Sequence, residues 1–265
     1  MSLFLITKIG VTVGIVLALS LAAERVSPRV AGILAGYPLG AAIALFFIGL
    51  EISPDFAARS AVYTLAGLAA SQVFVYCYFM VSSRIRSRSI PVSSAAALAG
   101  YFAAAWLLHP ISFSRAGAAL TAAASMLLSA FLFRRVPNVA IARSVRFTPA
   151  VLLLRACLAA GIIVAITAAA GAVGPAWAGL FSAFPTALFP LLLIVHITYY
   201  KAHVHTIIKN FPPGLGSLIA YGLSVSYFYP AWGVGWGTPA AFGIATLYLL
   251  AYSAVVARRL RLRRS

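Results

Sequence analysis

Acidic residues are almost absent from this sequence, which holds three Asp or Glu among 265 residues. Charged residues of both signs together make up 9% of the chain, whereas a soluble domain carries roughly 25%. This shortage excludes a water-soluble fold, because too few charged side chains remain to cover a wet surface. It also disfavours a cation site built from carboxylates, and we expect no bound metal.

Cysteine and catalytic motifs are scarce as well. Cys77 and Cys157 both lie within apolar runs, where a thiol acts as a small hydrophobic side chain rather than as part of a disulfide or metal site. The sequence contains no GxSxG, HExxH, P-loop or dinucleotide-binding motif. We therefore expect no catalytic residues, no cofactor and no enzymatic activity.

Apolar residues, in contrast, make up 63% of the chain. They form nine runs long enough to cross a bilayer, which takes about 20 residues per helix. The runs cover residues 3–22, 30–50, 61–81, 90–108, 116–133, 150–170, 177–199, 215–231 and 239–256. The sequence therefore predicts an all-α integral membrane protein with about nine transmembrane helices.

Basic residues gather on one side of these predicted helices. Alternate loops and the C-terminal tail hold sixteen of the 20 Lys and Arg residues, and the opposite loops hold only Arg59 and Arg115. Because positively charged loops stay in the cytoplasm, the pattern predicts a multi-pass protein of the bacterial inner (plasma) membrane. Its N-terminus would lie outside and its C-terminus in the cytoplasm. Basic residues at helix ends favour membrane lipids as partners and disfavour nucleic acid.

Two segments of the chain resemble each other. Pro28–Ala41 reads PRVAGILAGYPLGA and Pro175–Leu188 reads PAWAGLFSAFPTAL, so two prolines, an Ala-Gly pair and an aromatic-Pro pair recur at an offset of 147 residues. Gly67 and Gly214 match at the same offset. An internal duplication is favoured over chance matching in a chain rich in small residues.

The number of predicted helices between the two copies is odd, so the second copy should be inverted in the membrane. We expect a 4+1+4 arrangement, in which residues 1–108 form the first four-helix repeat and residues 109–149 form a linking helix and a basic cytoplasmic loop. Residues 150–265 then form the second four-helix repeat with its basic C-terminal tail. Inverted repeats are a recurring plan of secondary transporters, which bind their substrate where the repeats meet.

Prolines inside two predicted helices mark the candidate substrate site. Pro38 and Pro185 each remove a helix hydrogen bond, and helices broken at matching places in two halves often hold a transport site; a simple structural kink is the alternative. Gly32, Gly36 and Gly40 share one helix face, either for close packing or to line a site. The candidate substrate-binding residues around the prolines are Gly36, Tyr37, Pro38, Ser182, Phe184, Pro185 and Thr186.

Few ionisable side chains could carry a coupling ion. Glu51 ends the second predicted helix and is the candidate for proton coupling, with a solvated surface position as the alternative. His196, His203 and His205 lie near the cytoplasmic end of the seventh predicted helix. Since no carboxylate or thiol accompanies them, contacts with lipid headgroups are favoured over a metal site.

The repeat segments resemble the GlpM-like family of small bacterial inner-membrane proteins, whose single chain holds four spans. That family carries a segment of the AGLxxxFPT kind and an acidic residue thirteen positions after the proline. Here Glu51 follows Pro38 by thirteen residues, and Thr198 takes the matching place after Pro185. The resemblance implies a fused, inverted pair of such units and a loose association with envelope polysaccharide production.

These patterns predict an inner-membrane secondary transporter of a small organic or anionic solute, with its site at the interface of the inverted repeats. An alternative is a non-transporting accessory membrane subunit of an envelope polysaccharide or lipid pathway. A membrane-embedded enzyme acting on lipids ranks third, because no catalytic constellation is visible. The expected partners are membrane lipids and a small-molecule substrate, with a homodimer as an open alternative.

Overall fold

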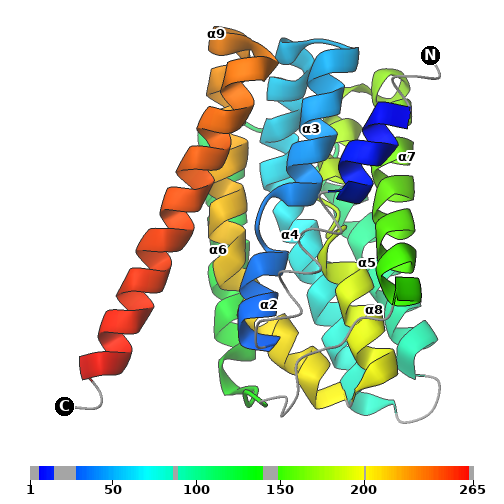
Figure 1. Cartoon of the computed structure of the whole chain (residues 1–265), viewed down its shortest axis with the longest axis vertical. Coiled ribbons are helices and arrows are strands. Elements are labelled where there is room, and N and C mark those ends of the chain that lie inside the picture. Colours follow the sequence, from blue (N-terminus) through cyan, green and yellow to red (C-terminus); the bar gives the residue numbers. More distant parts are fainter. Residues whose placement is uncertain (1–5, 15–27, 86–88, 140–148, 200, 263–265) are drawn as a thin grey trace.

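Helices and their short connections account for all of the chain that the structure describes. The computed structural model describes residues 6–14, 28–85, 89–139, 149–199 and 201–262, and within these ranges there is no β-strand. Residues 6–14 are helical, and the helices that follow form an elongated bundle (Figure 1). They are α2 (Pro28–Ala35), α3 (Leu39–Glu51), α4 (Pro54–Arg84), α5 (Ser89–Leu108), α6 (Arg115–Leu132), the 3₁₀ turn η1 (Phe133–Arg135), α7 (Pro149–Ser182), α8 (Leu188–Thr198) and α9 (Lys201–Leu262).

Six helical segments of the described chain are long and apolar enough to cross a membrane. They coincide with runs of Ala, Leu, Ile, Val and Phe, whose transfer into hydrocarbon is favourable only when the backbone hydrogen bonds are closed within the helix. The predicted all-α membrane fold is therefore confirmed at this level. The basic loop residues 86–88 and 140–148, and most of the first predicted span at 3–22, lie outside the described residues.

The two longest helices are each divided by one glycine. A straight helix of 62 residues would measure about 93 Å, roughly three times the thickness of the hydrocarbon core. α9 is not straight, because Gly233 has φ 70° and ψ 176°, and the chain turns back there at the upper end of Figure 1. Gly174 divides α7 in the same way, with φ 78° and ψ 171°. Positive φ is cheap only for glycine, so both breaks depend on these residues.

Two further interruptions occur where the sequence places Pro38 and Pro185. α2 stops at Ala35 and α3 starts at Leu39, while α7 stops at Ser182 and α8 starts at Leu188. Four backbone hydrogen bonds of the first break recur in the second break at the 147-residue offset. The N–H of Leu39 donates to the carbonyl of Tyr37 over 2.8 Å, and that of Thr186 donates to the carbonyl of Phe184 over 2.7 Å. The predicted breaks are thus present at both prolines.

α4 occupies the centre of the bundle and packs against α3, α5, α6, α7 and α9. It is longer than the predicted span of residues 61–81, because the hydroxyl of Ser53 accepts a hydrogen bond from the N–H of Phe56 and Pro54 starts the first turn. Asp55 and Arg59 therefore lie on the helix rather than in a loop. In Figure 1, α2 and α3 run upward, whereas the chain after the break at Gly174 in α7 runs down from the top towards α8 near the bottom. The two broken segments thus run in opposite directions.

Candidate functional site

The glycines of the first broken segment bring two backbones into direct contact. A Cβ atom added to Gly36 would lie 2.5 Å from the carbonyl carbon of Gly214 on α9. A Cβ atom added to Gly32 would lie 2.5 Å from the carbonyl oxygen of Ile207 and 3.1 Å from the Cβ of Asn210. Neither position has room for a side chain, so the predicted packing role is confirmed for Gly32 and Gly36.

The second broken segment makes the corresponding contacts with α4. A Cβ atom added to Gly179 would meet the carbonyl oxygen of Ser60 and lie 2.7 Å from the Cβ of Tyr63. Both partners are the partners of Gly32 shifted by 147 residues. One added to Gly67 would lie 2.7 Å from the Cβ of Ala183, which repeats the approach of Gly214 to Gly36. Each broken segment therefore packs on the long helix that follows the other one.

Hydroxyl groups of neighbouring helices satisfy carbonyls around the second break. The Oγ of Ser71 donates to the carbonyl of Ala183 over 2.5 Å, and the phenol of Tyr101 donates to the carbonyl of Leu180. Both side chains are buried. A carbonyl without a partner at this depth would cost several kcal/mol, so these two hydrogen bonds stabilise the interruption.

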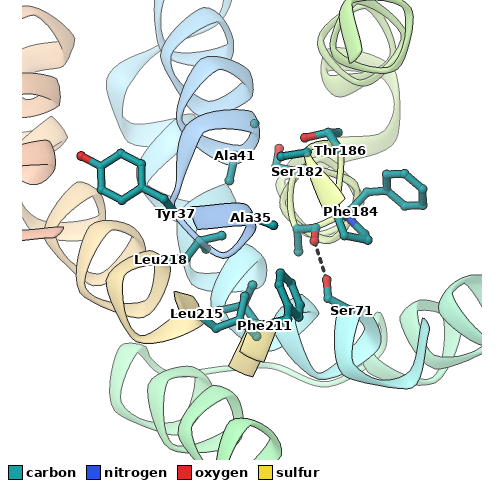
Figure 2. A pocket seen from close by; sticks show the side chains of 15 residues that line it. Ala35, Tyr37, Ala41, Ser71, Ser182, Phe184, Thr186, Phe211, Leu215 and Leu218 are labelled. Carbon is teal, nitrogen blue, oxygen red and sulfur yellow. Dashed lines mark hydrogen bonds between the residues drawn. The ribbon is translucent and has the colours of Figure 1, made fainter. Parts of the chain in front are cut away.

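A small cavity lies where the two broken segments meet (Figure 2). The space open to the centre of a water molecule measures about 20 Å³, which is room for roughly one water. None of the described residues that line it is charged, and most are small or apolar. They are Ala35, Tyr37, Gly40, Ala41, Leu68, Ser71, Ser182, Ala183, Phe184, Pro185, Thr186, Ala187, Phe211, Leu215 and Leu218.

The structure brings five of the seven predicted substrate-binding residues to this cavity. These are Tyr37, Ser182, Phe184, Pro185 and Thr186. Gly36 and Pro38 do not line it. Gly36 faces the backbone of Gly214 instead. A helix face in contact with another backbone has no surface left for a ligand.

The two aromatic residues of the breaks point away from each other, on opposite sides of the cavity (Figure 2). The hydroxyl of Tyr37 shares a hydrogen bond of 2.8 Å with Thr246 on α9. The ring of Phe184 packs edge-on against Tyr101 at 5.0 Å, and also against Phe74 and Phe189. Phe184 thus closes one side of the cavity within an aromatic cluster.

Beyond Phe184 lies a second hollow. It has a volume of about 550 Å³ and lies between α5 and α7, where Leu98, Phe102 and Ile162 form its walls and Phe184 and Phe189 belong to its floor. Phe184 lines both this groove and the central cavity. No sequence signal predicts it, because the hollow depends on the distance between two helices that are far apart in the chain.

Glu51 does not reach the central cavity. It forms an ion pair with Lys8, whose ammonium also donates to the hydroxyl of Thr167 over 2.8 Å and lies 5.4 Å from the ring centre of Phe47. The exposed fractions of the two paired side chains are 5% for Lys8 and 25% for Glu51. The sequence held a signal for this pair, since each is a lone charge near the same predicted membrane face.

We expect the Lys8–Glu51 pair to couple the first helix to α3. Lys8→Gln and Glu51→Gln should each lower the free energy of unfolding, because each leaves one charge poorly compensated. The double variant should be less destabilised than the two single variants added together, with a coupling energy of about 1–3 kcal/mol. Thermal unfolding in detergent measures all four proteins. Strictly additive losses would contradict the pair.

The histidines near the lower end of the bundle hold protein contacts. His196 is buried, and its ring nitrogens lie 2.9 Å from the hydroxyl of Tyr78 and 3.3 Å from that of Ser89. His205 lies 2.9 Å from the hydroxyl of Ser82. The predicted contact with lipid headgroups is therefore wrong for His196. No group of three potential metal ligands occurs in the described part of the chain.

These helices, spans and breaks define a multi-pass α-helical membrane protein. Comparison with protein-family models, curated proteins and solved structures found no match for this chain. The resemblance to the GlpM-like family therefore stays a prediction.

Proposed function

We propose that this chain is a secondary transporter of the bacterial inner membrane, built from two inverted four-helix repeats joined by α6. The observation behind the proposal is that each broken segment packs on the long helix of the other repeat, through equivalent residues. α2 packs on α9 with the residue pairs that the end of α7 uses on α4, shifted by 147 residues. A match in both partners and in the hydrogen bonds of the breaks favours duplication over chance.

Nine crossings follow from the same geometry if each glycine break returns the chain across the membrane. Residues 201–232 and 234–262 are then two spans, as are residues 149–173 and the broken segment from Pro175 to Thr198. The broken pair α2–α3 counts as one. The N-terminus lies outside and the C-terminus in the cytoplasm under this count, in keeping with the basic loops.

The uncharged lining of the central cavity favours a small organic solute that carries hydroxyl or carbonyl groups, ahead of an anion. Ser71, Ser182 and Thr186 supply hydroxyls, and the ends of the broken helices supply backbone dipoles. The cavity is smaller than a solute, so binding requires the repeats to move apart. Rocking of two halves about a central site is the usual motion of such transporters.

Proton coupling through Glu51 is part of the proposal. Release of Lys8 on protonation of Glu51 would loosen the contact between the first helix and α3. Glu51→Gln should then abolish the dependence of flux on an imposed pH gradient while leaving downhill flux measurable. Flux that still follows the gradient in this variant would remove Glu51 from the coupling step.

Uptake of a panel of small organic and anionic solutes into proteoliposomes, with and without a pH gradient, tests the proposal. We expect Ser182→Ala to lower the flux about tenfold, since the lost solute hydrogen bond is worth roughly 1 kcal/mol or more. Ser224→Ala is the matched control, because Ser224 is also buried and also donates to the carbonyl four residues earlier, away from the cavity.

Absence of flux for the whole panel would overturn transport. Copurification of a stoichiometric partner together with that absence would support the accessory subunit of an envelope polysaccharide or lipid pathway. Equal loss of flux in Ser182→Ala and Ser224→Ala would move the site away from the central cavity.

A further inference from the structure

A charged pocket lies at the upper end of the bundle, distant from the central cavity. It has a volume of about 440 Å³ and is formed by the first turns of α4 and α6 and by the end of the first half of α9. Its lining residues are Asp55, Ala58, Arg59, Val62, Arg115 and Pro230. Two guanidinium groups and one carboxylate give this lining a net charge of +1.

The charged side chains of the pocket do not pair with one another. In the part of the chain that the structure describes, no ion pair joins Asp55 to Arg59 or Arg115, so both arginines keep N–H groups available for an external acceptor. Both arginines are exposed. The guanidinium of Arg115 is fixed over the ring of Tyr227, 4.4 Å from its centre, and such stacking leaves the edge of the guanidinium free to donate.

The placement of the two arginines runs against the general charge pattern of the chain. Arg59 and Arg115 lie in the first two turns of α4 and α6, at the membrane face that the charge pattern places outside, where positive charge has no role in setting the topology. They are far apart in sequence, yet the fold brings both to one pocket.

Two helix starts add to the positive potential of the pocket. Ser53 caps α4, and Ser114 caps α6 by accepting a hydrogen bond of 3.0 Å from the N–H of Gly117. α6 begins at Arg115 itself. The positive ends of these two helix dipoles lie at this pocket, opposed by the negative end of the first half of α9.

We propose that the pocket binds a phosphate group, either the singly charged phosphodiester of an anionic lipid in the outer leaflet or free inorganic phosphate. Two guanidinium groups can each offer paired N–H donors to such an oxyanion, and the net charge of the lining is opposite in sign to that of the oxyanion. Tyr227, Trp232 and Trp236 are exposed at the same end of the bundle. Aromatic side chains of this kind mark the headgroup level, which places a lipid phosphate within reach. This inference does not depend on transport.

Lipid binding by the full-length protein tests the proposal in nanodiscs. We expect the purified protein to retain phosphatidylglycerol at least tenfold more tightly than phosphatidylcholine, measured by native mass spectrometry after release from the disc. Arg59→Gln with Arg115→Gln should abolish this preference. Arg84→Gln, at the exposed opposite end of α4, should leave it unchanged. Inorganic phosphate added to phosphatidylcholine discs should raise the melting temperature if free phosphate is the ligand.

Asp55→Asn supplies a second, independent test. Removing this carboxylate should tighten phosphatidylglycerol binding several-fold, because it opposes an anion, whereas a purely structural pocket would lose stability without any change in lipid preference. The proposal is overturned if the wild type shows neither a phosphatidylglycerol preference nor a phosphate-dependent shift in melting temperature. It is equally overturned if the double arginine variant binds as the wild type does.

Discussion

Replacing Gly36 by alanine should destabilise the bundle by at least about 2 kcal/mol, and replacing it by leucine should prevent folding. The added Cβ atom would lie 2.5 Å from the carbonyl carbon of Gly214 and 2.7 Å from the backbone nitrogen of Leu215. Both obstacles are backbone atoms, which cannot rotate away as a side chain could. α2 must therefore separate from α9. Thermal unfolding in detergent, followed by circular dichroism, measures the loss.

Gly243→Ala is the matched control for this substitution. Gly243 lies on the second half of α9, and a Cβ atom added there would meet nothing within 4 Å. Because alanine favours a helix by about 1 kcal/mol over glycine, this variant should be as stable as the wild type or slightly more so. Gly214→Ala should behave like Gly36→Ala. Equal stability of Gly36→Ala and Gly243→Ala would disprove the backbone contact between α2 and α9.

Single cysteines introduced at the ends of the helices should fall into two classes. Those on the outer face should react with a membrane-impermeant reagent in intact cells, and those on the cytoplasmic face should not. In a background lacking Cys77 and Cys157, we expect Ser83→Cys and Asn138→Cys to react with a membrane-impermeant maleimide only after the cells are opened. Ser112→Cys and Gly235→Cys should react in intact cells. Nine crossings with the returns at Gly174 and Gly233 require this division.

The labelling variants are chosen for exposure, so that the orientation alone decides the result. All four positions are exposed. Cysteines at 83 and 138 that react on different faces would remove α6 as a separate span and with it the inversion of the second repeat. A cysteine at 235 that reacts only in opened cells would show that the break at Gly233 does not return the chain across the membrane.

Much of the framework could be predicted because it depends on local properties. An apolar run inserts as a helix through the transfer free energy of its own side chains, and Pro38 and Pro185 break their helices because proline lacks an N–H. The spacing of Gly32, Gly36 and Gly40 predicted a close backbone approach, because residues four apart share one helix face. The pattern could not name the partner, which proved to be the backbone around Gly214 rather than a ligand.

The glycine breaks at Gly174 and Gly233 were visible only as gaps between apolar runs. Their positive φ values follow from the need to return the chain at once, without a polar loop. The start of α4 was predicted too late, because Asp55 and Arg59 read as loop residues. The cap at Ser53 extends the helix through them, and cap geometry outweighs the polarity of a single turn.

By itself, the sequence determined that this protein has apolar membrane helices, where two of them break, and which small residues approach a neighbour. These are properties of one segment at a time, set by hydrophobicity, proline and glycine. Only the tertiary structure decided that Lys8 forms an ion pair with Glu51, that Phe184 separates a cavity from a groove, and that Arg59 and Arg115 line one pocket. Each of these contacts depends on which distant helices lie side by side. The packing energy between two helices cannot be derived from the sequence of either helix alone.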